Sequence, residues 1–176
     1  MDTHDHIRLL CLDCDGVLTD GSLLISDAGE ESKRFHVHDG LALKAWQASG
    51  RGVAVITART SPALQRRMEE LGITELHQGA TDKRAVFDEI LKRNRIEASS
   101  VAYMGDDLGD IPVLSCCGLA MAPANACSEV RAMAHWVAER RGGEGAVRES
   151  VEMLMRQSGE WDRFVERCTS GASENG

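Results

Sequence analysis

The fold is decided by the stretch IRLLCLDCDGVLTDG, residues 7–21 of the chain. Its first six residues form a short run rich in leucine and isoleucine, which is typical of a buried strand. The run ends directly at Asp13, and Asp15 follows two residues later, at the start of a turn. The chain therefore begins with a buried strand that carries two carboxylates at its carboxyl end.

Beyond this stretch, strands and helices are expected to alternate. Apolar runs at residues 53–56 and 101–104 predict two more buried strands, and shorter strands are expected near residues 119–121 and 136–137. Capping residues and apolar periodicity predict helices at about residues 39–50, 61–72, 81–91, 111–116, 126–134 and 146–155. Because parallel strands need crossover helices, this alternation predicts an α/β, Rossmann-like three-layer sandwich with a mostly parallel sheet.

One segment departs from the alternation directly after the first strand. Residues 23–25 and 35–37 flank the turn-rich residues 26–30, which predicts a β-hairpin flap. His36 and His38 would share one face of its second strand. This pattern leaves two interpretations open, a metal site and a solvated histidine pair.

The length and charge of the chain limit the classes of function. Its 176 residues predict one domain over residues 1–157, followed by a polar tail over residues 158–176. The formal net charge of −8 argues against nucleic acid as a partner and against docking on an anionic membrane. No apolar run is long enough to span a bilayer, and the N-terminus lacks the pattern of a signal peptide. A cytoplasmic location is therefore expected.

Cys11 and Cys14 form a CxxC pair inside the first apolar run. The sequence has no second CxxC that would complete a four-thiolate zinc site. A cysteine in an apolar run packs as a small hydrophobic residue. We therefore expect both thiols to fill the core.

Polar side chains stand at the carboxyl ends of the three main strands. They are Asp13 and Asp15 after the first, Thr57, Ala58 and Arg59 after the second, and Asp106, Asp107 and Asp110 after the third. These ends meet at one edge of a parallel sheet, and Lys83 stands at a helix start near it. Crowded carboxylates repel unless a cation neutralises them, and an all-oxygen ligand set with open positions suits Mg²⁺.

The same edge has the groups that phosphoryl transfer needs. The Thr57 hydroxyl, the backbone N–H groups after it and the Lys83 ammonium can bind a phosphate. An aspartate can accept the phosphoryl group as an acyl phosphate. A second carboxyl two residues on can protonate the leaving oxygen and then activate water. The pattern therefore predicts phosphate-ester chemistry.

The order of these pieces resembles the four motifs of the haloacid dehalogenase superfamily of phosphatases. Within that superfamily, residues 7–157 resemble the 3-deoxy-D-manno-octulosonate 8-phosphate phosphatase family. The segments that carry this closer resemblance are residues 13–21, 35–40, 57–61, 78–83, 103–107 and 142–149.

The resemblance implies a role for each residue of the site. Asp13 would be the nucleophile and a Mg²⁺ ligand. Asp15 would be the general acid and base and would lend its backbone carbonyl to the metal, and Asp106 would be the third protein ligand. The other roles implied are phosphate binding by Thr57, Ala58 and Lys83, substrate binding by Arg59, and orientation of water and Lys83 by Asp107 and Asp110.

The resemblance also implies an assembly. Neither the segment from Asp15 to Thr57 nor that from Thr57 to Lys83 has room for the cap domain that closes most superfamily sites. The resemblance implies a homotetramer whose hairpins reach into adjacent sites, as in relatives of this family. We therefore expect a homotetramer, with the hairpin at residues 22–38 or the tail covering the site.

Several alternatives stay open. His38, Leu41, Ala42 and Glu144 depart from the family pattern in substrate-facing segments, so a 2-keto-3-deoxynonulosonate (sialic-type) 9-phosphate is an alternative substrate. A non-catalytic oligomerisation module related to sugar-nucleotide synthetases is a second alternative, against which the intact acidic and lysine residues count. The glycine-rich loop at residues 142–145 is either an anion site at a helix start or a tight turn.

Overall fold

The computed structural model describes residues 4–170 of the chain. Six parallel strands form one sheet in the order β5-β4-β1-β6-β7-β8. Their bounds are β1 Leu9–Leu12, β4 Gly52–Ile56, β5 Glu75–His77, β6 Val101–Met104, β7 Leu119–Ala122 and β8 Trp136–Val137. The central strand β1 pairs with β4 on one side and β6 on the other, which sets the ends of these three strands side by side.

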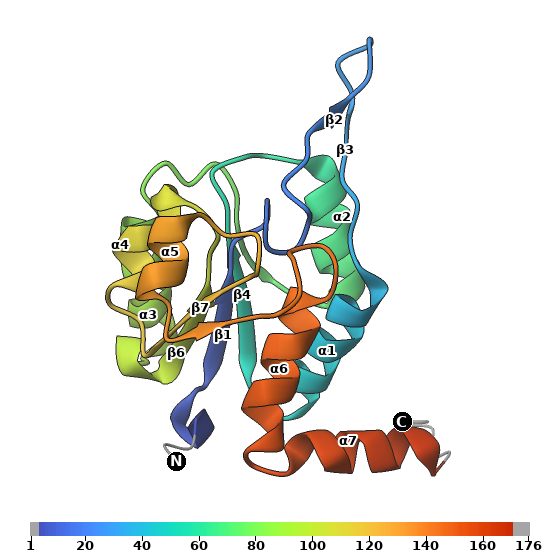
Figure 1. The fold of residues 1–176 in the computed structure, drawn as a ribbon, viewed down its shortest axis with the longest axis vertical. Coiled ribbons are helices and arrows are strands. Elements are labelled where there is room, and N and C mark those ends of the chain that lie inside the picture. The colour runs from blue at the N-terminus through green and yellow to red at the C-terminus, as the bar shows by residue number, and fades with distance from the viewer. Residues whose placement is uncertain (1–3, 171–176) are drawn as a thin grey trace.

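Helices cover both faces of the sheet (Figure 1). Their bounds are α1 Val37–Ala48, α2 Pro62–Leu71, α3 Lys83–Asn94, α4 Ile111–Leu114, α5 Ser128–Met133, α6 Ala146–Arg156 and α7 Glu160–Thr169, with short 3₁₀ turns η1 His4–His6, η2 Ala98–Ser100 and η3 Leu108–Asp110. Successive residues of β1 point to opposite faces, so Leu10 packs against α1, α2 and α6, and Cys11 packs against α3, α4 and α5. The expected α/β sandwich is confirmed, and Cys11 and Cys14 are buried free thiols in its core.

Local signals set the helices that carry site residues. Ser61 caps α2 by accepting a hydrogen bond from the Leu64 amide, and Gly72 ends that helix in the left-handed conformation at φ 69°. The Asp82 side chain caps α3 by accepting a hydrogen bond from the Ala85 amide at 3.0 Å. Because Asp82 fixes the first turn, Lys83 begins α3 next to the sheet edge.

The hairpin is shorter than predicted. Its strands are β2 Leu24–Ile25 and β3 Glu31–Ser32, and residues 35–37 form no second strand. Continuing the register would set Gly21 opposite Phe35, but Gly21 has φ 81° and ends the extended segment. The expectation that His36 and His38 share a strand face is therefore wrong, because His36 instead precedes α1 and His38 lies within its first turn.

The segment after residue 157 contains a helix. Trp161 of α7 is 1% exposed, and Glu160 pairs with Arg51, which directly precedes β4. Helix α7 therefore lies at the amino ends of the strands, at the end of the molecule opposite the hairpin (Figure 1). Residues 158–170 cannot cover the carboxyl edge of their own chain, and the rest of the predicted tail lies outside the described residues. Between residues 4 and 170, no helix combines the length and apolar character needed to cross a membrane.

Candidate active site

One cavity brings together all nine residues that the sequence singled out. It has a volume of about 340 Å³ and lies at the carboxyl ends of β1, β4 and β6. Its lining consists of Asp13, Asp15, Thr57, Ala58, Arg59, Lys83, Asp106, Asp107 and Asp110, together with Gly21 and Gly109. The expectation that strand ends bring these groups together is therefore confirmed.

Asp13 is the buried carboxylate at the floor of this cavity. Its amide donates a hydrogen bond to the Met104 carbonyl at 3.0 Å, which continues the pairing of β1 with β6. The Lys83 ammonium lies 2.9 Å from Asp13 Oδ1. Burial and then the nearby Asp110 charge raise the pKa of Asp13 to about 6, although Lys83 opposes the shift.

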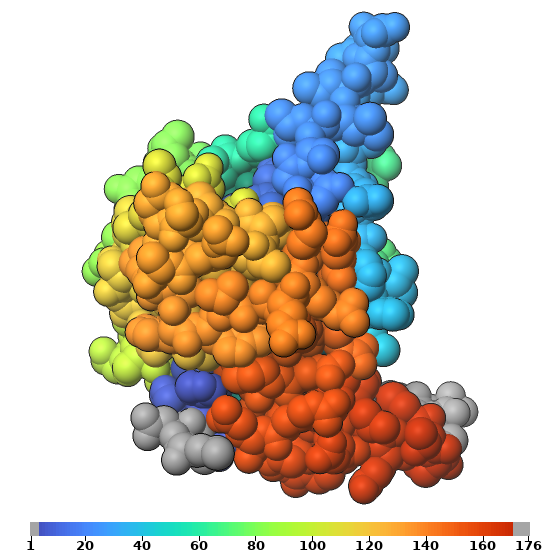
Figure 2. Space-filling view, in the orientation of Figure 1, coloured from blue at the N-terminus to red at the C-terminus, as the bar shows by residue number. Residues whose placement is uncertain are grey.

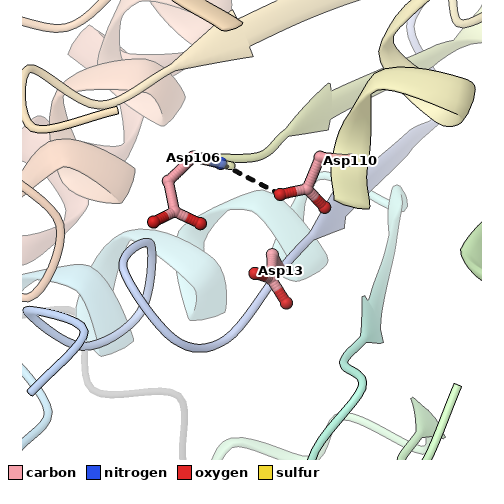
Figure 3. Close-up of side chains that lie close together, drawn as sticks. All are labelled: Asp13, Asp106 and Asp110. Carbon is pink, nitrogen blue, oxygen red and sulfur yellow. Dashed lines mark hydrogen bonds between the residues drawn. The ribbon is translucent and has the colours of Figure 1, made fainter. Parts of the chain in front are cut away.

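Asp106 extends the acidic cluster from the end of β6. Figure 3 shows the carboxyl groups of Asp13, Asp106 and Asp110 gathered around one space, and an oxygen from each lies within 4.8 Å of the others. Burial, followed by Asp13 and Asp110, raises the pKa of Asp106 to about 7. Gly16 makes this approach possible, because a Cβ at its position would lie 1.9 Å from Asp106 Oδ2.

Asp110 is held differently from the other two. Its Oδ1 accepts hydrogen bonds from the Tyr103 hydroxyl at 2.6 Å and from Lys83 Nζ at 2.7 Å. Its Oδ2 accepts from the backbone amides of Asp106 at 3.1 Å and Asp107 at 3.3 Å. Four donors therefore occupy this carboxylate, which makes Asp110 a brace for Lys83 and the loop after β6.

The donor set of the cluster suits a hard divalent cation. The Asp13 carboxylate is buried, the nearby Asp106 carboxylate is half-buried, and Lys83 neutralises them only in part. All their donor atoms are oxygens, which favour Mg²⁺ or Ca²⁺ over softer ions. With Asp110 committed to protein donors, Asp13 and Asp106 are the carboxylates that could hold such an ion.

Thr57 and Ala58 form the wall of the cavity at the end of β4. Thr57 is buried, and its amide and carbonyl are bonded to the His77 carbonyl and the Ala80 amide. Its hydroxyl accepts a hydrogen bond from the Arg59 amide at 3.4 Å. The backbone is therefore fixed on both sides, and the threonine hydroxyl stays at the cavity surface.

The hairpin adds a residue that sequence reasoning missed. Lys33 reaches down from the hairpin to Asp15 Oδ1, and its Nζ lies 3.3 Å from Glu31 Oε1. Glu31 also pairs with Arg59, whose Nε lies 4.0 Å from Asp15 Oδ2. Motif spacing could not reveal Lys33, because its position depends on where the hairpin folds back.

The glycine-rich loop at residues 142–145 supports the first aspartate loop. The Gly142 amide donates to Asn125 Oδ1 at 2.6 Å, and Asn125 Nδ2 donates to the Gly16 carbonyl. A Cβ on Gly142 would lie 1.8 Å from that carbonyl oxygen. At the start of α6, the Arg148 amide already donates to Asp39 Oδ1 at 2.8 Å. These contacts favour the tight-turn interpretation of the loop.

Comparisons with known proteins agree with this geometry. A family model described as haloacid dehalogenase-like hydrolase matches residues 69–148. The chain is 41% identical to the 3-deoxy-D-manno-octulosonate 8-phosphate phosphatase KdsC of Yersinia pestis, over 85% of this chain and 80% of that protein. It is also 41% identical to the Escherichia coli K12 protein of the same name, over 90% of this chain and 84% of that protein.

A solved structure of the same kind is also similar. It is the 3-deoxy-D-manno-octulosonate 8-phosphate phosphatase of Moraxella catarrhalis in complex with a magnesium ion, a phosphate ion and a KDO molecule. Its TM-score is 0.90 at 38% sequence identity, and the match covers 93% of this chain and 94% of that one.

Proposed function

Because the chain belongs to the 3-deoxy-D-manno-octulosonate 8-phosphate phosphatase family, we propose that it hydrolyses this sugar phosphate to the free sugar acid and inorganic phosphate. The observation that carries the proposal is the single cavity that holds Asp13, Asp15, Lys83 and Asp106 together. The activity is that of a phosphoric monoester hydrolase, and the pathway that it would serve is lipopolysaccharide biosynthesis.

The reaction proceeds in two steps through a phosphoaspartate. A carboxylate oxygen of Asp13 attacks phosphorus, and the bond between phosphorus and the sugar oxygen breaks. Protonated Asp15 gives its proton to that leaving oxygen, so the sugar departs as a neutral alcohol. Asp15 then takes a proton from water as the water attacks phosphorus, which frees Asp13 and restores the proton on Asp15.

Three residues of the cavity bind the transferring phosphoryl group. Lys83 supplies positive charge next to the nucleophile, from which it lies 2.9 Å. The Thr57 hydroxyl and the Ala58 amide donate hydrogen bonds to phosphoryl oxygens. Asp110 keeps Lys83 in place through its 2.7 Å contact, and Asp107 orients water near the metal.

Mg²⁺ is the cofactor that the oxygen ligands suit. The Asp13 and Asp106 carboxylates and the Asp15 backbone carbonyl would hold it. When bound, the ion neutralises the acidic cluster and the charge on the phosphoryl group. Burial, followed by the neighbouring carboxylates, raises the pKa values of Asp13 and Asp106, and a cation bound between them would oppose that shift.

Arg59 would face the sugar, since it lies on the exposed rim of the cavity. The proposed domain is residues 1–157, with residues 158–176 as a tail. The proposed location is the cytoplasm.

We further propose that the protein is a homotetramer in which hairpins cover neighbouring sites. Figure 2 shows the hairpin standing out from the body of the molecule. Its side chains Leu23, Leu24 and Ile25 are 51%, 67% and 58% exposed. Adjacent exposed apolar side chains are typical of a surface that contacts another protein, which supports a neighbouring subunit at the hairpin. Light scattering tests this proposal, and a fully active monomer would overturn it.

A phosphate-release screen over sugar phosphates with Mg²⁺ tests the proposed activity. The eight-carbon 8-phosphate should be the preferred substrate, and Asp13→Asn should abolish release from it. A preference for a nine-carbon 9-phosphate would replace the substrate but keep the chemistry. Activity that survives Asp13→Asn would remove Asp13 as the nucleophile.

A further inference from the structure

A second lysine side chain is buried next to the cavity, where it pairs with Asp15, whereas Lys83 pairs with Asp13. The Lys33 side chain is 2% exposed although it comes from a hairpin that otherwise projects into solvent. Its ammonium donates to Asp15 Oδ1 and lies 3.3 Å from Glu31 Oε1. Burying an ammonium is costly, so these two carboxylates are what keep it there.

This contact distinguishes the two oxygens of Asp15. Oδ1 is occupied by Lys33 and lies 3.5 Å from the Thr19 hydroxyl. Oδ2 is buried and has no hydrogen-bond partner among the described residues, and Arg59 Nε lies 4.0 Å from it. Hydrogen bonding therefore holds the carboxyl group through Oδ1, and Oδ2 is the buried oxygen that is left without a partner.

Glu31 fixes the lysine in turn. It accepts from Arg59 through Oε2 and lies beside Lys33 through Oε1. The hairpin strand β3 thus connects Lys33, Asp15 and the cavity rim into one ionic network. The network joins the base of the hairpin to two residues that line the cavity of the same chain, Asp15 and Arg59.

We propose that Lys33 is a positioning residue that holds Asp15 Oδ1 and thereby leaves Oδ2 as the oxygen that carries the proton to the leaving group. The inference rests on the proposed function. In the first step, the proton on Asp15 Oδ2 moves to the sugar oxygen as its bond to phosphorus breaks. Lys33 keeps all its protons throughout.

The leaving group provides the test. A sugar alkoxide needs a proton to depart, whereas p-nitrophenolate leaves readily without one. The measured quantity is kcat/KM, which covers only the steps up to formation of the phosphoaspartate. Loss of a general acid typically costs about 10²-fold, so Lys33→Met should lower kcat/KM by about 10²-fold for the sugar phosphate and by less than about 5-fold for p-nitrophenyl phosphate.

Two further variants complete the experiment. Lys33→Arg keeps a donor to Asp15 and should restore at least part of the lost rate on the sugar phosphate alone. Arg34→Met is the matched control, because Arg34 lies on the same hairpin and pairs with Asp20 at the surface. It should leave both substrates unchanged.

Equal losses on both substrates, or no loss on either, would overturn the inference. If Lys33→Met does not fold, Glu31→Gln gives the same test, with a smaller loss confined to the sugar phosphate. Failure of the proposed function looks different, because wild-type protein would then hydrolyse p-nitrophenyl phosphate and not the sugar phosphate. The leaving-group contrast can in that case be measured on another alkyl phosphate that the enzyme accepts.

Discussion

Replacing Asp110 with asparagine should destabilise the metal-free protein strongly, although the two side chains have nearly the same shape. Asp110 accepts four hydrogen bonds, two on each carboxylate oxygen. An asparagine offers one acceptor oxygen and one donor group. Whichever way its amide is turned, two donors that Asp110 satisfied lose their acceptor.

The size of the effect follows from these donors. Charge contributes little on balance, because Lys83 at 2.7 Å attracts Asp110 while Asp13 and Asp106, with oxygens within 4.8 Å, repel it. A buried donor without an acceptor costs about 1–3 kcal/mol, so two of them should cost about 3 kcal/mol in the free energy of unfolding. For a domain of this size, that loss lowers Tm by about 6–12 °C.

The assay is thermal unfolding of the metal-free protein, followed by a Mg²⁺ titration of its activity. Asp88→Asn is the matched control, since Asp88 pairs with Arg84 on the surface and its loss should cost below about 1 kcal/mol. An unchanged Tm together with a large loss of Mg²⁺ affinity would contradict this prediction. Asp110 would then be a metal ligand and not a brace.

Three other predictions concern the metal cluster and the terminal helix. Gly16→Ala should lower Mg²⁺-dependent activity about 10²-fold or more, because the added Cβ would clash with the Asp106 carboxylate and alanine disfavours a φ of 91°. A titration of activity with Mg²⁺ measures this loss, and saturation at the wild-type Mg²⁺ concentration would contradict the prediction. Folding raises the pKa values of Asp13 and Asp106 from 3.8 to about 6 and about 7, so the folded protein binds these protons more tightly than the unfolded chain. The protonated carboxyls are therefore tolerated below pH 4, and the folded protein loses stability as the pH rises through 7 and both carboxyls ionise. Mg²⁺ should therefore raise Tm more at pH 8 than at pH 5, and an equal rise at both would be the contrary result. Arg51→Met breaks the pair with Glu160, which is only partly buried, so it should cost about 1–2 kcal/mol, between the values for exposed and fully buried pairs. Urea unfolding measures this loss, and initial rates should show an unchanged kcat.

Strand ends explain why much of the site was predictable. Asp13, Thr57 and Asp106 follow apolar runs that can only be central strands, and parallel strands bring such residues to one edge. The start of α3 was predictable because Asp82 is a strong capping residue, and this start places Lys83. These positions depend on short stretches of sequence and on one general rule of sheet topology.

Other parts of the site depend on contacts between distant segments. Lys33 reaches Asp15 only because the hairpin folds back after β3. The second strand of the hairpin was instead predicted at residues 35–37, beyond Lys33. The Asp39 carboxylate meets the Arg148 amide across two helices that are far apart in sequence. Neither periodicity nor motif spacing predicts such contacts, because they depend on how the helices and the hairpin pack in three dimensions.

The most direct test of Asp13 as the nucleophile is to trap the phosphoryl group on the protein during turnover. Wild-type protein with Mg²⁺ and 3-deoxy-D-manno-octulosonate 8-phosphate would be quenched rapidly, reduced with borohydride and digested for mass spectrometry. We expect reduction of a single side chain, Asp13, and none in protein quenched without substrate. A reduced carboxylate at any other position, or phosphate release with Asp13 unmodified throughout, would contradict it.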